Sequence, residues 1–349
     1  MSAAIQVLVT MPFTGAQLDR LRGVSERLVV TRADAATADY ARTNVLYAVA
    51  PPRDLARAPA LRWVQLHMAG VNTLYDHPIY AQSDLPVTTT SGVHAATIAE
   101  YAITVLLALA HRVPRMVEWK GRGGWPPDLE RWPLFVPSEV RGATLGIIGY
   151  GSIGRELARI AKTAFAMTVL ACKRDPSRHA DDGYTLPGTG DPEGRLPDAW
   201  FAPDQLPDLL RRSDAVVLCA PLTRETERMI DARALAAMKP SAYFINVGRG
   251  ASVDEVALAE ALRDRRIAGA AVDVFAQEPP PAGHPLYATR GVEATTARTP
   301  LAENTIVSPH VSGFLPSYDD KCTDLFAENL RRYLAGAPLL NLVDRAKGY

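Results

Sequence analysis

The feature that most constrains the chain is a glycine-rich stretch near its middle. Residues 144–154 read Thr-Leu-Gly-Ile-Ile-Gly-Tyr-Gly-Ser-Ile-Gly, so a short apolar run leads into the pattern Gly-x-Gly-x-x-Gly. Apolar residues at helical spacing follow, and residues 167–171 form the next strand-like run. This order predicts a strand, a tight turn and a helix N-terminus whose amides bind the pyrophosphate of a dinucleotide. A plain strand–helix turn is the alternative, and the flanking pattern favours dinucleotide binding.

Each glycine of this pattern has its own structural reason. Gly149 permits the tight turn, Gly151 lets the backbone approach the pyrophosphate, and Gly154 lets the helix pack closely on the strand. Ser152 and Ile153 begin the helix and complete the predicted phosphate-binding turn.

The length of the chain and the alternation of its elements predict the fold class. The chain has 349 residues, which suggests about two domains of roughly 100–200 residues each. Apolar strand-like runs alternate with helical patterns both before and after the glycine stretch. Such alternation is typical of α/β domains with parallel sheets.

Composition narrows the partners and the compartment. The chain has 38 Lys and Arg against 38 Asp and Glu, so its charge favours neither nucleic acid nor an acidic membrane as a partner. The N-terminus lacks the pattern of a signal peptide, and the most apolar helical run, 98–110, is too short to span a bilayer. The three cysteines support neither a disulfide framework nor a zinc site. We therefore expect a cytoplasmic protein without a metal centre.

Three segments lack clear periodicity. Residues 120–137 are rich in Gly, Pro and Trp, so we expect no helix or strand there, and the tryptophans suit either a subunit contact or burial under a loop. Residues 175–203 carry many Pro, Gly and Asp residues and predict an irregular surface excursion. Residues 289–303 are polar and irregular, and they could shape the site or the subunit interface.

Unusual polar groups follow three of the predicted strands in the second half of the chain. These segments are 246–250 (Asn-Val-Gly-Arg-Gly), 273–279 (Asp-Val-Phe-Ala-Gln-Glu-Pro) and 308–313 (Ser-Pro-His-Val-Ser-Gly). In an open parallel sheet, ligands bind beyond the carboxyl ends of the strands. The three segments are therefore expected to converge where a nicotinamide ring would lie.

The side chains in these segments suit reduction of a 2-keto acid. Arg249 offers a planar fork for a carboxylate and a neighbouring carbonyl. His310 can exchange a proton with a carbonyl or hydroxyl oxygen, and Glu278 can hold the other imidazole nitrogen. Each residue has an ordinary alternative role: Arg249 could form a surface ion pair, His310 could cap a turn, and Glu278 could be a solvated loop residue. Their joint occurrence with the glycine pattern favours the chemical interpretation.

On these motifs the chain resembles the D-isomer-specific 2-hydroxyacid dehydrogenase family, which includes glyoxylate, hydroxypyruvate and D-lactate type reductases. The resemblance covers nearly the whole chain. Besides the glycine pattern it rests, in family order, on 220–226 (Ala-Pro-Leu-Thr, then Thr226), 246–250, 273–279 and Pro309-His310.

The resemblance implies a role for each matching residue. Arg249 would bind the substrate carboxylate and polarise its carbonyl, and Glu278 and His310 would form the acid/base pair. Backbone amides of Ala69 and Gly70 would hold the substrate carboxylate. The remaining implied cofactor-binding residues are Ala220, Pro221, Thr226, Val247, Gly248 and Asp273.

The resemblance also implies an architecture. It predicts two Rossmann-like or flavodoxin-like parallel-sheet domains with a cleft between them, usually assembled as a homodimer through the nucleotide domain. Because the glycine turn lies far into the chain, the substrate-binding domain is expected to be discontinuous, over 1–96 and 311–349. The dinucleotide-binding Rossmann domain is then 97–310.

The sharpest departure from the family pattern concerns the cofactor. NAD-preferring enzymes place Asp or Glu at the end of the second Rossmann strand to bind the adenosine ribose. Here Lys173 and Arg174 stand there, and their charges attract a 2′-phosphate, so we expect a preference for NADP(H). Asp175 follows directly and could reach a ribose, which leaves NAD(H) possible. In two further departures, Asn72 replaces the usual Asp, and Ala166 stands where the family commonly has Gly.

Two other functions compete with this one. A phosphite-type dehydrogenase would also use an arginine and a histidine, whereas a formate-type enzyme is disfavoured because Glu278 stands where a Gln is expected. A dinucleotide-sensing protein like the family's transcriptional corepressors would bind a partner peptide without useful turnover. The presence of Arg249, Glu278 and His310 favours an enzyme over a sensor. The family resemblance implies glyoxylate or hydroxypyruvate as its leading substrates.

Overall fold

The computed structural model describes residues 4–287 and 304–349, so the predicted segment 289–303 lies outside the described residues. The chain divides into two compact units. Unit 1 comprises Met1–His94, Asp182–Leu186 and Leu315–Tyr349, and unit 2 comprises Ala95–Asp181 and Pro187–Phe314. The boundaries near residues 94 and 314 lie within four residues of those expected at 96 and 311. The inclusion of Asp182–Leu186 in unit 1 was not expected.

Unit 1 contains a five-stranded parallel sheet in the order β2-β1-β3-β4-β5. Its strands are β1 (Ile5–Val9), β2 (Leu28–Arg32), β3 (Val45–Ala48), β4 (Trp63–Leu66) and β5 (Val87–Thr88). Its helices are α1 (Gly15–Arg22), α2 (Pro78–Ala81) and α10 (Tyr318–Ala335), with short 3₁₀ turns η1 (Leu55–Arg57) and η2 (Asn72–Leu74). The segment before the glycine stretch thus contains strands that alternate with helices, as the sequence predicts.

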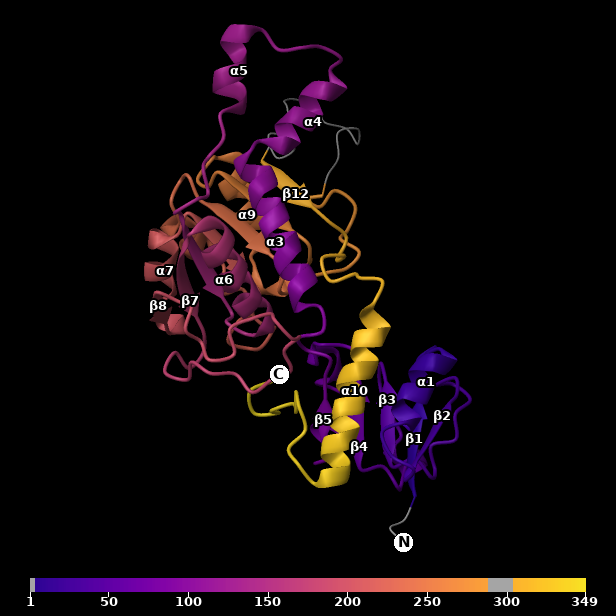
Figure 1. Ribbon diagram of the computed structural model, residues 1–349. Coiled ribbons are helices and arrows are strands. Elements are labelled where there is room, and N and C mark those ends of the chain that lie inside the picture. Colours follow the sequence, from indigo (N-terminus) through magenta and orange to yellow (C-terminus); the bar gives the residue numbers. More distant parts are fainter. Residues whose placement is uncertain (1–3, 288–303) are drawn as a thin grey trace. The chain divides into compact units, whose positions relative to one another are not determined.

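The C-terminal helix α10 completes the core of unit 1 (Figure 1). The ring of Phe326 on α10 lies 4.9 Å from that of Tyr47 on β3 and 5.4 Å from that of Trp63 on β4, measured between centroids. All three side chains are fully buried, so the last helix contributes to the same core as the first strands.

Unit 2 contains a seven-stranded parallel sheet in the order β8-β7-β6-β9-β10-β11-β12. Its strands are β6 (Thr144–Ile148), β7 (Thr168–Cys172), β8 (Ala199–Phe201), β9 (Ala215–Leu218), β10 (Tyr243–Asn246), β11 (Gly269–Val272) and β12 (Thr305–Val307). Its helices are α3 (Ala95–Ala110), α4 (Val113–Gly121), α5 (Asp128–Phe135), α6 (Ser152–Phe165), α7 (Leu206–Arg212), α8 (Ala232–Ala237) and α9 (Glu255–Arg263), with 3₁₀ turns η3 (Pro203–Gln205) and η4 (Gly250–Ser252).

This sheet is doubly wound. Helices α3 and α6 share one buried apolar cluster with the sheet, and α7, α8 and α9 share another. The strand order reverses between β6 and β9, which is the position where open α/β sheets bind ligands. The two parallel-sheet units confirm the predicted fold class.

The strand register brings the predicted site segments to one edge of this sheet. Ile148 of β6 pairs with Leu218 of β9, Leu218 with Asn246 of β10, Asn246 with Val272 of β11, and Val272 with Val307 of β12. These five residues are the last of their strands. The glycine turn and the segments that follow β9, β10, β11 and β12 therefore leave the sheet level with one another.

The prediction for residues 120–137 was wrong. The structure has helix α4 up to Gly121 and helix α5 from Asp128. The glycines at 121–124 and the prolines at 126–127 lie at and between the helix ends, where they interrupt the chain without preventing either helix. The tryptophans are mostly on the surface: Trp125 is 81% exposed and Trp132 is 76% exposed.

The excursion 175–203 is more ordered than its composition predicts. It contains strand β8, and its middle part, Asp182–Leu186, belongs to unit 1. There the Tyr184 N–H donates to Asn341 Oδ1 over 2.9 Å. In unit 2, the buried Asp191 accepts a hydrogen bond from the Tyr150 hydroxyl over 2.8 Å. These partners are distant in sequence, which is why local pattern does not reveal them.

Within residues 4–287 and 304–349, no single helix is both long and apolar enough to cross a membrane. Helices α3 and α4, bent by 62° at their junction, meet that criterion only when they are counted together.

Candidate active site

The glycine turn has the geometry that its sequence predicts. Gly149 has a φ of 98°, and a Cβ added to it would lie 2.6 Å from the Ala220 nitrogen. A Cβ on Gly154 would lie 2.4 Å from the Gly149 carbonyl oxygen, so only glycine allows α6 to approach β6 this closely. A Cβ on Gly151 would meet no described atom within 4 Å, so this part of the turn borders open space.

Helix α6 leaves its N-terminal amides available to a ligand. Gly151 is the N-cap of this helix, and glycine has no side chain that could accept hydrogen bonds from the first turn. The backbone N–H groups of the first turn, which starts with Ser152 and Ile153, are therefore not capped by the N-cap residue. Uncapped amides and the helix dipole suit a pyrophosphate, and the donor set therefore fits a dinucleotide. Cofactor binding by these residues stays a prediction.

The ends of β9 and β10 come close together beside this turn. A Cβ on Gly248 would lie 2.9 Å from the Ala220 carbonyl oxygen. The Thr226 hydroxyl donates to the Pro221 carbonyl over 2.7 Å and accepts from the Thr223 N–H over 2.8 Å. Thr226 thus closes the loop after β9, and a direct contact with the cofactor stays a prediction.

Arg249 lies on a turn that Asn246 shapes. The Asn246 amide donates to the Arg249 carbonyl over 3.2 Å and accepts from the Gly248 N–H over 3.1 Å. The Arg249 side chain is partly buried, and its Nη1 donates to the Gly248 carbonyl over 2.8 Å. Asn246 is buried, and its residue type alone does not reveal that it shapes this turn.

Asp273 closes the turn that carries His310. Its carboxylate is 1% exposed and accepts from Ser308 Oγ (2.6 Å), the Val311 N–H (3.0 Å) and the Ser312 N–H (3.1 Å). Its backbone carbonyl accepts from the His310 N–H over 2.8 Å. His310 has a φ of 55°, a left-handed conformation that a non-glycine residue adopts only when its surroundings hold it there.

His310 and Glu278 form the hydrogen-bonded pair that the sequence suggests. Glu278 Oε2 lies 2.7 Å from His310 Nδ1, and Oε1 accepts from the Phe275 N–H over 2.9 Å. The side chains are 50% and 37% exposed, so the pair is open to a small molecule. With Nδ1 donating to the carboxylate, Nε2 is the nitrogen that can exchange a proton with a substrate.

The two cations after β7 have protein partners. Lys173 Nζ donates to the Arg178 carbonyl over 2.6 Å, and burial, followed by the charge of Arg155, lowers the pKa of Lys173. The Arg174 guanidinium pairs with Glu225 over 2.6 Å. Asp175 accepts from the Ser177 hydroxyl over 2.6 Å and so caps its own turn. A 2′-phosphate would have to compete with the Arg174–Glu225 pair.

Ala69 and Gly70 lie in unit 1, in the bend that follows β4. The bend is held by its neighbours: the Tyr318 hydroxyl donates to the His67 carbonyl over 2.9 Å, and the Thr90 N–H donates to the Met68 carbonyl over 3.1 Å. The other predicted site residues all belong to unit 2.

Two further residues of unit 2 support the site. The Tyr101 hydroxyl of α3 hydrogen-bonds to Ser308, which in turn donates to Asp273. Ser308 was visible in the sequence as part of the last polar strand end, whereas nothing in the sequence distinguishes Tyr101 from a core residue of α3.

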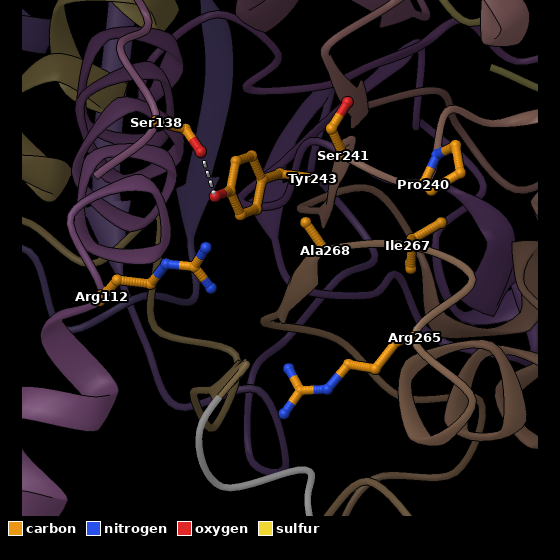
Figure 2. A pocket seen from close by; sticks show the side chains of 8 residues that line it. All are labelled: Arg112, Ser138, Pro240, Ser241, Tyr243, Arg265, Ile267 and Ala268. Atoms are coloured by element: carbon orange, nitrogen blue, oxygen red, sulfur yellow. Dashed lines mark hydrogen bonds between the residues drawn. The ribbon is translucent and has the colours of Figure 1, made fainter. Parts of the chain in front are cut away.

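One cavity in unit 2 lies away from these groups. Figure 2 shows its lining, in which the Arg112 and Arg265 side chains extend toward the cavity and Tyr243 bonds to Ser138. Tyr243 begins β10 and Ala268 precedes β11, so the cavity lies at the opposite ends of these strands from Arg249 and Asp273. In the described part of the chain, no group of three or more His, Cys, Asp or Glu residues is arranged to hold a metal ion.

Comparisons with known proteins agree with this geometry. The family model described as "D-isomer specific 2-hydroxyacid dehydrogenase, NAD binding domain" matches residues 103–312. The chain is 34% identical over 287 residues to the (S)-sulfolactate dehydrogenase of Chromohalobacter salexigens, covering 80% of each protein. It is 34% identical over 298 residues to the glyoxylate reductase of Aeropyrum pernix, covering 83% of this chain and 78% of the relative.

A solved structure extends the similarity to the whole chain. The D-isomer specific 2-hydroxyacid dehydrogenase from Xanthobacter autotrophicus Py2, in complex with NADPH and MES, matches with a TM-score of 0.77 and 28% identity over 100% of both chains. The protein is an oxidoreductase that uses NAD(P) and acts on the CH–OH group of a 2-hydroxy acid, and it belongs to the D-isomer specific 2-hydroxyacid dehydrogenase family.

Proposed function

We propose that this protein is an NADPH-preferring reductase of small 2-keto acids, with glyoxylate or hydroxypyruvate as its leading substrates. The observation that carries the proposal is the common sheet edge of unit 2, where the glycine turn, Arg249 and the His310–Glu278 pair follow strands that end level with one another. A hydride-transfer site needs these parts together: a dinucleotide site, a carboxylate clamp and a proton donor.

The glycine turn and the ends of β9 and β10 would hold the cofactor. The amides of Ser152 and Ile153 would bind the pyrophosphate, and backbone at Ala220, Val247 and Gly248 would line the rest of the dinucleotide. When bound, the nicotinamide supplies or accepts the hydride, and the chain binds and orients the substrate and moves the proton.

Arg249 and His310 would act on the substrate directly. The Arg249 fork would bind the substrate carboxylate and polarise the adjacent carbonyl, together with the amides of Ala69 and Gly70. His310 would donate the Nε2 proton to the carbonyl oxygen as the alcohol forms. Glu278 holds Nδ1 at 2.7 Å and so favours the ring orientation that this step needs.

A substrate panel with a matched variant tests the proposal. Purified protein is assayed for oxidation of NADPH and NADH with glyoxylate, hydroxypyruvate, pyruvate and 3-sulfopyruvate. His310→Ala is expected to lower kcat by about 10²–10⁴-fold, the contribution usual for a general acid, and to leave NADPH binding within about threefold. Absence of turnover with every keto acid, or an unchanged kcat in His310→Ala, would contradict the proposal.

The relatives guide the choice of substrates. The relative from Aeropyrum pernix is named a glyoxylate reductase and that from Chromohalobacter salexigens an (S)-sulfolactate dehydrogenase, so 3-sulfopyruvate, the keto acid of sulfolactate, belongs in the panel. Both names describe enzymes that act on organic 2-hydroxy acids. They therefore support the proposed reductase rather than the two alternatives from the sequence analysis, a phosphite-type enzyme and a corepressor-like protein.

The NADP(H) preference rests on Lys173 and Arg174 and on the NADPH bound to the relative from Xanthobacter autotrophicus. The Arg174–Glu225 pair is partly exposed, and such pairs contribute only about 0–1 kcal/mol, so a phosphate can replace the carboxylate. NAD(H) remains the second cofactor.

Two variants test this preference. Arg174→Ala is expected to lower kcat/KM for NADPH by about 10- to 100-fold and to change kcat/KM for NADH by less than about threefold. Glu225→Gln removes the carboxylate charge that competes with a phosphate for Arg174, and it is expected to improve kcat/KM for NADPH alone. A wild-type enzyme that prefers NADH would contradict the assignment.

We further propose that two copies assemble through helices α4 and α5. These helices project from the body of unit 2 (Figure 1) and expose several large apolar side chains. Val117 is 65% exposed, Leu129 is 93% exposed, and both Trp125 and Trp132 lie on the surface. Light scattering after gel filtration is expected to give a dimer, and Leu129→Asp is expected to shift it toward the monomer.

A cytoplasmic location is part of the proposal. It is supported by the three cysteines, Cys172, Cys219 and Cys322, which are all free thiols rather than disulfide-bonded. Fractionation of cells that express the protein tests this location.

A further inference from the structure

We propose that Glu255 and His284, which lie outside the acid/base pair, are positioning residues that set the geometry of that pair. The proposal rests on the assignment of Glu278 and His310 made above. It starts from two neighbouring amides, those of Phe275 and Ala276, in the loop that follows β11.

These two amides bind two different carboxylates. The Phe275 N–H donates to Glu278 Oε1 over 2.9 Å, and the Ala276 N–H donates to Glu255 Oε1 over 2.8 Å. The second oxygen of each carboxylate binds an imidazole: Glu278 Oε2 lies 2.7 Å from His310 Nδ1, and Glu255 Oε2 lies 3.0 Å from His284 Nε2. One backbone turn thus joins an exposed His–Glu pair to a second, more buried one.

The second pair is the better enclosed of the two. The side chains of Glu255 and His284 are 14% and 9% exposed, against 37% and 50% for Glu278 and His310. His284 Nδ1 accepts from the Leu286 N–H over 3.3 Å, which leaves Nε2 as the donor to Glu255 and assigns the neutral tautomer. Hydrogen bonds to a charged carboxylate in an enclosed place are stronger than those at the open surface.

The turn is held from two other directions as well. The His284 ring packs edge-on against the Phe275 ring, with centroids 5.2 Å apart and planes at 89°. On the other side, a Cβ added to Gly250 would lie 1.8 Å from the Phe275 carbonyl carbon, so the loop that carries Arg249 abuts the same peptide. A shift of the turn would therefore move Glu278 with respect to both His310 and Arg249.

Glu255 holds this turn from a rigid element. It is the first residue of α9, and that helix is capped by Asp254, whose side chain accepts from the Ala257 N–H over 3.0 Å. The loop 273–287 carries Glu278, and the helix that anchors it is packed in the core. Residues that fix a reacting group in this way change kcat without touching the substrate.

The test combines kinetics with a double-mutant cycle. Glu255→Ala removes both hydrogen bonds and is expected to lower kcat by about 10- to 100-fold, the effect of a misplacement of roughly 1 Å, with the Kd for NADPH within about threefold. Glu255→Gln keeps one of the two bonds and is expected to lie between Glu255→Ala and the wild type. Glu260→Ala, an exposed position on the same helix, serves as the control and is expected to leave kcat unchanged.

The cycle separates positioning from general destabilisation. In a Glu278→Gln background, Glu255→Ala is expected to lower kcat by no more than about threefold, because its effect passes through Glu278. If the double variant instead loses kcat by the product of the two single-variant effects, the proposal is wrong. If Glu255→Ala does not fold, His284→Phe replaces it, since it keeps a ring against Phe275 but removes both hydrogen bonds, and an unchanged kcat in that variant would equally overturn it.

The same data distinguish this inference from the function on which it rests. If Glu278→Gln and His310→Ala retain wild-type kcat, the acid/base assignment fails and the inference fails with it. If those two variants lose activity and Glu255→Ala does not, the positioning role alone is wrong.

Discussion

Replacing Asp273 by asparagine tests how the turn that carries His310 is held. Three donors converge on the two carboxylate oxygens of Asp273: the Ser308 hydroxyl and the N–H groups of Val311 and Ser312. Asparagine offers one acceptor oxygen and one NH₂ group, so one backbone N–H must face another donor. In a side chain that is 1% exposed, water cannot make up for that loss.

The magnitude follows from these contacts. A hydrogen bond to a charged group contributes about 1.5–3 kcal/mol, and the two bonds that remain lose their charge-assisted part. We therefore expect Asp273→Asn to lower the free energy of unfolding by about 2–4 kcal/mol. Because His310 then leaves its left-handed conformation more readily, kcat should fall by about 10- to 100-fold, whereas the Kd for NADPH should stay within about threefold.

Urea unfolding and steady-state kinetics on the same preparations measure both effects. Asp214→Asn is the matched control, because that carboxylate also accepts a backbone N–H (Thr144, 2.8 Å) and pairs with Lys239 (2.7 Å), but it lies at the opposite ends of the strands. It is expected to lower stability and to leave kcat unchanged. An Asp273→Asn variant whose kcat stays within about twofold of wild type would refute the reasoning.

Three further variants probe the backbone and the pH dependence. Gly154→Ala places a Cβ 2.4 Å from the Gly149 carbonyl, so we expect a loss of about 1–3 kcal/mol in urea unfolding and at least a tenfold higher Kd for NADPH by fluorescence titration; wild-type affinity would contradict this. Ala166, the C-cap of α6, has a φ of 51°, a strained conformation that costs about 1–2 kcal/mol and that glycine would relieve. Glycine also makes the unfolded chain more flexible, which lowers stability by about 0.4–1 kcal/mol. The midpoint of urea unfolding of Ala166→Gly should therefore rise modestly, and a lower midpoint would show that this strain is absent. The hydrogen bond from the Ala257 N–H holds the pKa of Asp254 below its ordinary value. The charged Asp254 carboxylate therefore stabilises the fold above about pH 4, and this contribution is lost as the pH falls through the folded-state pKa. Asp254→Asn should lose less stability between about pH 5 and 3 than the wild type, and an equal loss would rule this carboxylate out as a contributor.

The local features of the chain could be predicted because they depend on neighbours in sequence. Alternating apolar runs indicate the strands of both sheets except β8, and the spacing of Gly149, Gly151 and Gly154 specifies the turn before α6. The glycine turn follows β6, and polar residues follow β10, β11 and β12. The sequence therefore predicted that they lie at one edge of a parallel sheet, because the ends of parallel strands meet there. The register between strands bears this out.

The predictions for segments 120–137 and 175–203 failed because they relied on amino-acid composition, whereas tertiary contacts decide the structure there. Glycines and prolines in 120–137 suggested an irregular segment, yet those at 121–127 lie at and between the ends of α4 and α5, and Pro133 lies inside α5. The excursion 175–203 has no local periodicity, but Asp191 and Tyr184 anchor it through hydrogen bonds to Tyr150 and Asn341. Such bonds join residues 41 and 157 positions apart, a range that no local pattern records.

The sequence by itself determined the class of fold and the glycine turn before α6, and it predicted which side chains act chemically, because each depends on residue type at short spacing. Only the tertiary structure decided how those side chains are held. It shows that Asp273 binds the turn of His310, that Glu225 pairs with Arg174, and that Glu255 and His284 hold the loop of Glu278. These contacts arise when loops from separate strands meet at one edge of the sheet, and their distances depend on the register and packing of the whole of unit 2.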